Sequence, residues 1–212
     1  MTKKLNAARV MRDLRKWSLD VLEKPSDFYA GLPPCPYAKT AWSEGLVFIH
    51  VIDDLEEVSQ IKGKMPVSGY SNTIHVCCLI EFENLSAKEL ENWIDKQNEN
   101  HFGVWLMGFH PDSPESEGVP EYVSEIEDDF VVVLVQSLSE LDDAAQSLEK
   151  TGYYDRFDEE DTLYFANRRR VRNAWKEKVD EESYGQSEWN EEGFPFDSRG
   201  EEKSAGGKRK AH

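Results

Sequence analysis

Apolar residues recur at helical spacing near the start of the chain. They are four, three and four residues apart, which is the spacing of one face of an α-helix: Val10, Leu14, Trp17 and Val21. The pattern predicts a helix over residues 5–23. Pro25 marks its end, because the residue before a proline disfavours helical geometry.

Four later apolar runs have the length and composition of β-strands: 45–52, 73–82, 103–109 and 130–135. The run 73–82 is apolar on both faces, which is typical of a central strand. Polar residues with helix-capping chemistry separate some of these runs. Ser86 and Glu89 form a capping box for one helix, and Ser139 is the predicted cap of a helix over 140–150. A last helix is predicted from residue 159 to about 178.

From the first strand onward the elements follow the order ββα-ββα. This order predicts an α/β (α+β) fold with a four-stranded mixed sheet and flanking helices. We expect one α/β domain over residues 1–178, because a chain of this size commonly forms a single core. Gly, Ser, Glu and Lys dominate residues 179–212, and this composition predicts a disordered acidic and polar tail.

Connection lengths predict which strand ends lie together. A crossover helix makes the second and third strands parallel. The first and second strands lack a long crossover helix, so an antiparallel pair is expected there, and likewise for the third and fourth. The start of the first strand would then share one sheet edge with the end of the third. That edge collects the candidate site residues, which are Cys35, Tyr37, Lys39, His110 and Asp112.

A rigid loop over residues 30–39 carries the first part of this candidate site. It contains three prolines, which fix φ and remove backbone donors. An imidazole beside Cys35 would make its thiol nucleophilic, since the thiolate is the reactive form. His110 would serve as base or ligand, and Lys39 or Tyr37 would orient a substrate. The bland alternatives are a buried Cys35, a His110 that only ends a strand and an Asp112 in a turn.

Charge narrows the classes of partner. The chain has 25 lysines and arginines against 42 aspartates and glutamates, a formal net charge of −17. This argues against nucleic acid and anionic membranes, although residues 168–172 include four arginines on one predicted helix. A solvated helix is the favoured interpretation of that arginine cluster.

No run approaches the ~20 apolar residues of a membrane span, and no signal-peptide pattern is present. Three cysteines without a disulfide spacing point to a cytoplasmic protein.

Metal-binding and nucleotide-binding motifs are missing from the sequence. There is no CxxC, HExxH, P-loop or GxGxxG motif. Cys77 and Cys78 are adjacent on a strand and face opposite ways. His50 and His75 can approach each other, but at the edge opposite His110. We therefore predict no metal site, and the sequence identifies no cofactor.

Two short motifs resemble a bacterial family of unknown function. Its members carry Gly-Leu-x-x-Cys-Pro-Phe-Ala early and a Phe-His-Pro strand end later. The matching segments here are Gly31-Leu32-Pro33-Pro34-Cys35-Pro36-Tyr37-Ala38 and Gly108-Phe109-His110-Pro111. Tyr37 replaces the family's phenylalanine, and an acidic loop replaces its Asn-Arg-Ser-Pro segment. The resemblance spans roughly residues 14–140, and it links Cys35 with His110 without implying a reaction.

Two hypotheses follow from these patterns. The first is a small-molecule or thiol-chemistry site at the Cys35/His110 sheet edge. The second is a non-catalytic acidic adaptor that binds a basic protein partner. Whether the protein is an enzyme stays open at this point.

Overall fold

A computed structural model describes residues 7–65, 72–99, 103–113 and 130–187, with side chains described up to Lys178. The chain divides into two compact units, residues 1–176 and 177–212. The elements, in chain order, are α1 (Ala7–Trp17), a π-helical turn (Ser18–Leu22), a 3-10 turn (Asp27–Tyr29), α2 (Ala38–Ser43), β1 (Val47–Ile52), α3 (Leu55–Lys62), β2 (Ile74–Leu79), α4 (Ala87–Glu99), β3 (Val104–Phe109), β4 (Val131–Ser137), α5 (Leu138–Leu148), a second 3-10 turn (Glu149–Thr151) and α6 (Glu159–Ser187).

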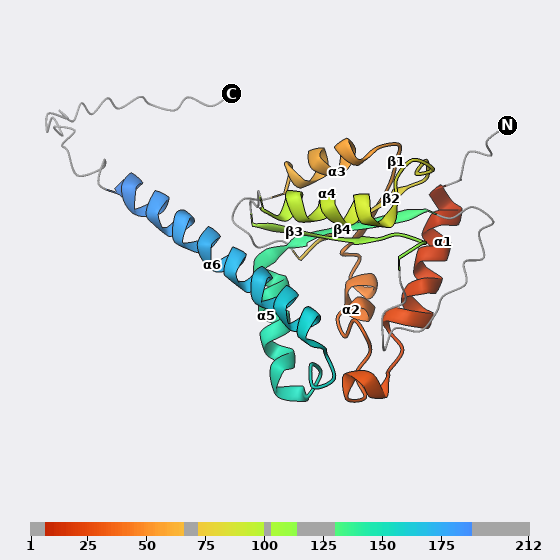
Figure 1. Ribbon diagram of the computed structural model, residues 1–212, viewed down its shortest axis with the longest axis horizontal. Helices are drawn as coiled ribbons and strands as arrows, with labels where there is room; N and C mark the ends of the chain where they lie inside the picture. Colours follow the sequence, from red (N-terminus) through yellow and green to blue (C-terminus); the bar gives the residue numbers. More distant parts are fainter. Residues whose placement is uncertain (1–6, 66–71, 100–102, 114–129, 188–212) are drawn as a thin grey trace, which may run out of the picture. The chain divides into compact units, whose positions relative to one another are not determined.

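The strands form one mixed sheet in the order β1-β2-β4-β3 (Figure 1). β4 is antiparallel to both of its neighbours, β2 and β3. The predicted four-stranded mixed sheet with flanking helices is confirmed, and so are the parallel directions of β2 and β3. β4 lies between these two strands, however, so they are not adjacent.

The predicted antiparallel pairing of β1 with β2 is wrong. The two strands are parallel, with Val47 opposite Ile74 and Ile52 opposite Leu79. α3 provides the crossover, so the first half of the ββα-ββα order contains a helix between its strands. Asp54 caps α3 by accepting the backbone N–H groups of Glu56 and Glu57. Eight residues of helix are enough to return the chain in the same direction.

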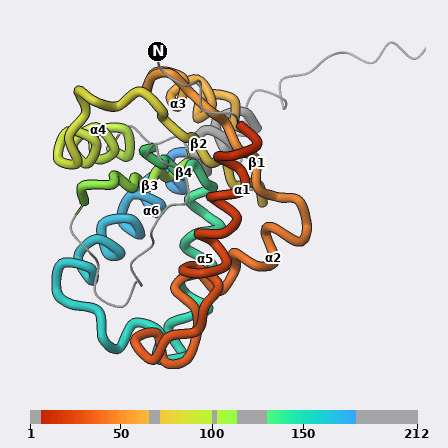
Figure 2. The backbone as a smooth tube through the Cα atoms, turned by 90° about the vertical axis from the view of Figure 1, so that its right-hand side faces the viewer, coloured from red at the N-terminus to blue at the C-terminus, as the bar shows by residue number. Residues whose placement is uncertain are grey.

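Helices cover both faces of the sheet. α3 and α4 lie together on one face, while α1 and α5 lie on the other (Figure 2). The core under α3 and α4 is the larger, and it includes Val58, Leu90, Leu106 and Val133. Across the sheet, Val10 and Leu14 of α1 pack against Cys78 and neighbouring residues. Trp105 of β3 packs with Leu138 and with Val171 of α6.

Helix caps explain where two helices begin. Ser86 and Glu89 form the predicted capping box: the Ser86 hydroxyl accepts the Glu89 N–H at 3.3 Å, and the Glu89 carboxylate accepts the Ser86 N–H at 2.9 Å. α5 begins earlier than predicted, and its cap is Ser137 in place of Ser139. The reason is that β4 turns directly into α5, with the Leu138 N–H donated to the Gly103 carbonyl at 2.9 Å.

The final helix is longer than predicted. α6 continues to Ser187, whereas the sequence pattern placed its end near residue 178. Residues 188–212, on which most of the predicted disordered tail falls, lie outside the described residues. In the part of the chain that is described, no helix combines the length and apolar character needed to cross a membrane.

The outer edge of β3 is closed by a side chain. Asn98 of α4 is buried, and its amide binds the outward backbone groups of Leu106 in both directions. The Leu106 N–H donates to Oδ1 at 2.9 Å, and Nδ2 donates to the Leu106 carbonyl at 3.0 Å. This edge strand therefore has its central backbone groups satisfied without a further strand.

Replacing Asn98 with alanine should destabilise the protein, because it leaves a buried N–H and a buried carbonyl of Leu106 without partners. We expect the free energy of unfolding to fall by about 3 kcal/mol, measured by chemical denaturation. Asn173→Ala, at an exposed position of α6, is the control and should change little. Equal effects of the two substitutions would contradict this role for Asn98.

A second prediction concerns Gly103, which precedes β3 with φ of +72°. A Cβ built there would lie 2.8 Å from the Trp175 ring of α6. Gly103→Ala should therefore cost about 2 kcal/mol of unfolding free energy, through backbone strain and displacement of Trp175.

The matched control for Gly103→Ala is Gly63→Ala. Gly63 has a helical φ of −65°, and its Cβ would make ordinary contacts. It should be close to neutral. Adding Trp175→Leu to Gly103→Ala should recover part of the loss, and no recovery would show that the clash with Trp175 is not the cause.

Candidate functional site

The loop of residues 30–39 is held from both sides by hydrogen bonds. The Cys35 N–H donates to the Leu22 carbonyl at 2.9 Å, and the Cys35 carbonyl accepts the Ala38 N–H at 3.1 Å. The Tyr153 hydroxyl donates to the Pro34 carbonyl. The predicted rigid loop leads directly into α2, a short helix that the sequence pattern does not predict.

The Cys35 thiol is half-buried next to the first turn of α2. Burial raises its pKa above the ordinary thiol value, and the negative charge of Glu23 adds to this effect. The backbone N–H groups of Tyr37 and Ala38 hydrogen-bond the thiol and oppose the shift without cancelling it. A thiol with a raised pKa stays protonated at neutral pH, so this environment does not activate a nucleophile.

His110 follows β3 and has both ring nitrogens engaged. Its Nε2 is 2.7 Å from the Leu85 carbonyl, and its Nδ1 is 3.1 Å from the Asp112 backbone N–H. Because a carbonyl can only accept and an N–H can only donate, the partners assign the proton to Nε2. The side chain is 1% exposed and packs edge-on against Phe82. In this arrangement His110 ties the end of β3 to the loop before α4.

The structure does not bring Cys35 and His110 together. Because β1 is parallel to β2 and β2 runs in the same direction as β3, the start of β1 and the end of β3 lie at opposite ends of the strands. Cys35 precedes β1 through α2, whereas His110 directly follows β3. The predicted shared edge depended on an antiparallel β1, so that inference is wrong.

The other predicted site residues divide in the same way. Tyr37 and Lys39 stay with Cys35, and both are exposed. The Tyr37 hydroxyl donates to the Ala144 carbonyl of α5 at 3.3 Å. Asp112 stays with His110, but its side chain is 86% exposed and its carboxylate lies 3.8 Å from Nδ1. The predicted small-molecule or thiol chemistry of these residues stays a prediction.

A polar cluster joins the end of α1 to α2 beside this loop. The π-helical turn places Ser18 in the interior, where its hydroxyl accepts from the Trp42 indole at 2.8 Å and donates to Glu23 at 2.8 Å. Arg15 forms an ion pair with Glu23, and its guanidinium lies 5.1 Å from the centre of the Trp42 ring. π-Helical turns often occur at functional sites. Here these polar groups are hydrogen-bonded or ion-paired with one another, so the cluster stabilises the junction between α1 and α2.

Aromatic side chains also hold the loop of residues 30–39 in place. Tyr29 of the first 3-10 turn stacks on Tyr153 with ring centres 4.9 Å apart, and Phe157 packs against both. Burial raises the pKa of Tyr153, so its hydroxyl stays protonated and keeps donating to Pro34. The prolines and aromatics of this region therefore have a packing role.

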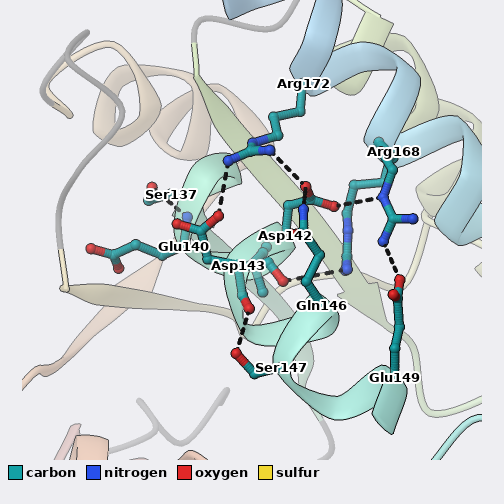
Figure 3. A network of polar contacts seen from close by, with 11 residues as sticks. Ser137, Glu140, Asp142, Asp143, Gln146, Ser147, Glu149, Arg168 and Arg172 are labelled. Carbon is teal, nitrogen blue, oxygen red and sulfur yellow. Dashed lines mark hydrogen bonds and ion pairs between the residues drawn. The ribbon is translucent and has the colours of Figure 1, made fainter.

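The arginine cluster of α6 is largely used inside the protein. Asp142 of α5 is 1% exposed, and Arg169 and Arg172 reach its carboxylate at 3.4 and 3.0 Å. Arg172 also contacts Asp143 at 2.9 Å (Figure 3). Arg169 contacts Glu149 at 2.6 Å. These ion pairs hold α6 against α5, which leaves Arg170 as the exposed member beside Asn167.

The predicted proximity of His50 to His75 and the opposite orientations of Cys77 and Cys78 are confirmed. His50 Nε2 lies 2.9 Å from His75 Nδ1, and desolvation lowers the pKa of both rings. Cys77 and Cys78 belong to the cores on opposite faces of the sheet. Among the residues that the structure describes, no group of three or more His, Cys, Asp or Glu side chains is placed to hold a metal ion.

One feature was missed by sequence reasoning, the hollow between α5 and α6. It measures about 250 Å³ and is lined by residues that include Tyr154, Phe165 and Arg168. Its only signal in the sequence was the arginine run, whose members look alike until the pairing of α5 with α6 distinguishes them.

Comparison with known proteins returns no matching family model, no matching curated protein and no matching solved structure. The function is therefore inferred from the geometry of this chain.

The raised pKa of Cys35 predicts slow alkylation by iodoacetamide at neutral pH, with the rate increasing as the pH rises above the ordinary thiol value of about 8.5. His110→Ala should leave this pH profile unchanged, because the imidazole does not contact the thiol. Mass spectrometry of labelled native protein measures the rate at each pH.

Cys35→Ser is the control for that experiment. It should abolish native labelling, since burial raises the pKa of both Cys77 and Cys78 to about 12. Rapid labelling of Cys35 at pH 7 that slows in His110→Ala would contradict the geometry and restore a thiol–imidazole pair.

Proposed function

We propose that the protein is a non-catalytic binding protein that recruits a basic partner by pairing an extended segment of that partner with β1. The observation that carries this proposal is the open edge of the sheet at β1. Three further features support it: the apolar character of the strand, its exposure and the charge of the chain.

The backbone of β1 has one side free for pairing. The Leu46 carbonyl accepts the Ile74 N–H at 2.9 Å, so alternate residues from Leu46 onward direct their backbone groups toward β2. The N–H and C=O groups of Val47, Ile49 and Val51 then face the other way. No described strand pairs with β1 on that side, and a partner strand could add there.

The side chains of β1 are unusual for an exposed edge. All of them are apolar except His50. Phe48 is exposed and Ile52 is buried, and the others are half-buried, with Val47, Ile49 and Val51 packed against the core under α1. Natural edge strands are commonly protected by charges, prolines or bulges, because a bare apolar edge promotes association. β1 has none of the charges or prolines, whereas Asn98 closes the edge at β3. The difference favours β1 as a site kept open for a partner.

A stack of aromatic rings joins β1 to β2 beside this edge. Phe48 is 46% exposed and stacks on His75 with ring centres 5.5 Å apart, and His75 stacks in turn on His50. Ile52 belongs to the core with Val58 of α3, whereas Phe48 is exposed and both histidines are half-buried. Exposed aromatic rings often supply a large share of binding energy in protein interfaces.

Charge indicates the kind of partner. Each copy of the chain carries a net charge of −17, so pairing β1 with β1 of a second copy would bring two strongly acidic molecules together. A segment rich in lysine or arginine would instead be attracted and steered toward the strand. A basic, extended segment of another protein is therefore the occupant that we propose.

A synthetic peptide in which lysine alternates with valine tests this proposal, with a glutamate–valine peptide as its charge-reversed counterpart. We expect only the basic peptide to bind, with the largest NMR shifts at the amides of Val47, Ile49 and Val51. Its affinity should fall as salt is added, because salt screens the attraction.

Ile49→Pro removes one outward backbone N–H without removing a hydrogen bond to β2. It should therefore reduce the affinity for the basic peptide about tenfold. Ile49→Ala is the matched control, since it shortens the side chain but keeps the N–H, and it should bind nearly as well as wild type. Shifts confined to other surfaces, or equal binding of the two peptides, would refute the proposal.

A further inference from the structure

The hollow between α5 and α6 has an apolar, largely aromatic wall. Tyr154, Phe157 and Phe165 form this wall with Ala145 and Ala166, and the rest of the lining is polar or charged: Asp142, Glu149, Thr162, Arg168 and Arg169. Its volume of about 250 Å³ lies just below the usual range of ligand pockets, about 300–1,000 Å³, so it suits a small ligand. All of these residues belong to the unit formed by residues 1–176, and none is part of the β1 surface.

Arg168 lines the same hollow and is incompletely satisfied. It is only 5% exposed, and its Nε is a buried donor without a hydrogen-bond partner. Its Nη2 makes one long contact, 3.5 Å from the Leu141 carbonyl. A buried donor without a partner is costly, which makes such a group a marker of a missing ligand.

The neighbouring carboxylates do not complete Arg168. Within the described part of the chain, no carboxylate lies at ion-pair distance from it. Asp142 acts on Arg168 only from longer range, because its oxygens are occupied by Arg169, Arg172 and Gln146. Burial lowers the pKa of Arg168, in keeping with a cation that lacks a close counter-charge.

We infer that the hollow binds a small organic carboxylate, with the carboxylate on Arg168 and an apolar or aromatic body against Phe165 and Tyr154. Nε–H and Nη2 form one side of the guanidinium fork, and a carboxylate can accept from both at once. The Arg168 guanidinium lies 5.0 Å from the centre of the Phe165 ring, which holds the fork in place. This site is independent of the pairing proposed for β1.

Phenylacetate is a suitable probe, with uncharged phenylethanol as its matched analogue and inorganic phosphate as an anion without an apolar body. The full-length protein is titrated with each, and the Arg168 Nε–H signal is followed by NMR. We expect phenylacetate to bind saturably and move that signal. Phenylethanol and phosphate should each bind at least about tenfold more weakly.

Three variants test the assignment. Arg168→Lys keeps the charge but loses the planar guanidinium. The affinity for phenylacetate should therefore fall about tenfold, while the affinity for phenylethanol stays the same. Arg170→Lys, at the exposed neighbouring position, should change nothing. Ala166→Trp fills the hollow from an exposed position and should block both ligands without disturbing the core.

Equal affinity for phenylacetate and phenylethanol would overturn the inference, because Arg168 would then contribute nothing. Phosphate binding as tightly as phenylacetate would also overturn it, since the aromatic wall would then contribute nothing. Failure of phenylacetate to bind would overturn it as well. If Arg168→Lys does not fold, the wild-type comparison of the two aromatic ligands and the Arg168 Nε–H signal still decide the outcome.

Discussion

The hydrogen-bonded ladder of β4 is the constraint on which the rest of the structure depends. β4 pairs with β2 on one side and β3 on the other, and its valines at 131, 133 and 135 are fully buried. A strand in this position must be apolar and uninterrupted, because each of its backbone groups is used and both of its faces are covered. α5 begins directly after its last residue, so β4 also sets where α5 and the helix paired with it are placed.

Local periodicity was sufficient to find most of the elements. The apolar spacing of α1, the capping box of α4 and the runs that became the strands are all properties of neighbouring residues. Pairing is a property of distant residues, and there the sequence was less informative. α3 lies in a polar segment and is short, so the sequence pattern does not predict its role as a crossover and predicts the wrong direction for β1. The inferred partnership of Cys35 with His110 depended on that direction.

The same distinction explains what could be predicted at the candidate sites. Cys35 and His110 carry familiar chemistry in the sequence, yet their surroundings are structural: a half-buried thiol with a raised pKa and an imidazole with both nitrogens bound. Arg168 looked like one of several arginines on a solvated helix. Only the pairing of α5 with α6 shows that two neighbours are neutralised by Asp142, while Arg168 has a donor left over. Residue identity suggests chemistry, but burial and partners decide it.

The unequal treatment of the two sheet edges has a consequence for assembly. A molecule with two open edges can add strands at both and grow into a fibre. Here Asn98 occupies the outward backbone groups of Leu106 and hinders addition at β3, so among the described strands β1 is the edge at which the proposed partner strand would add. Each chain then has a valence of one, and any complex formed by strand addition closes after a single partner has joined.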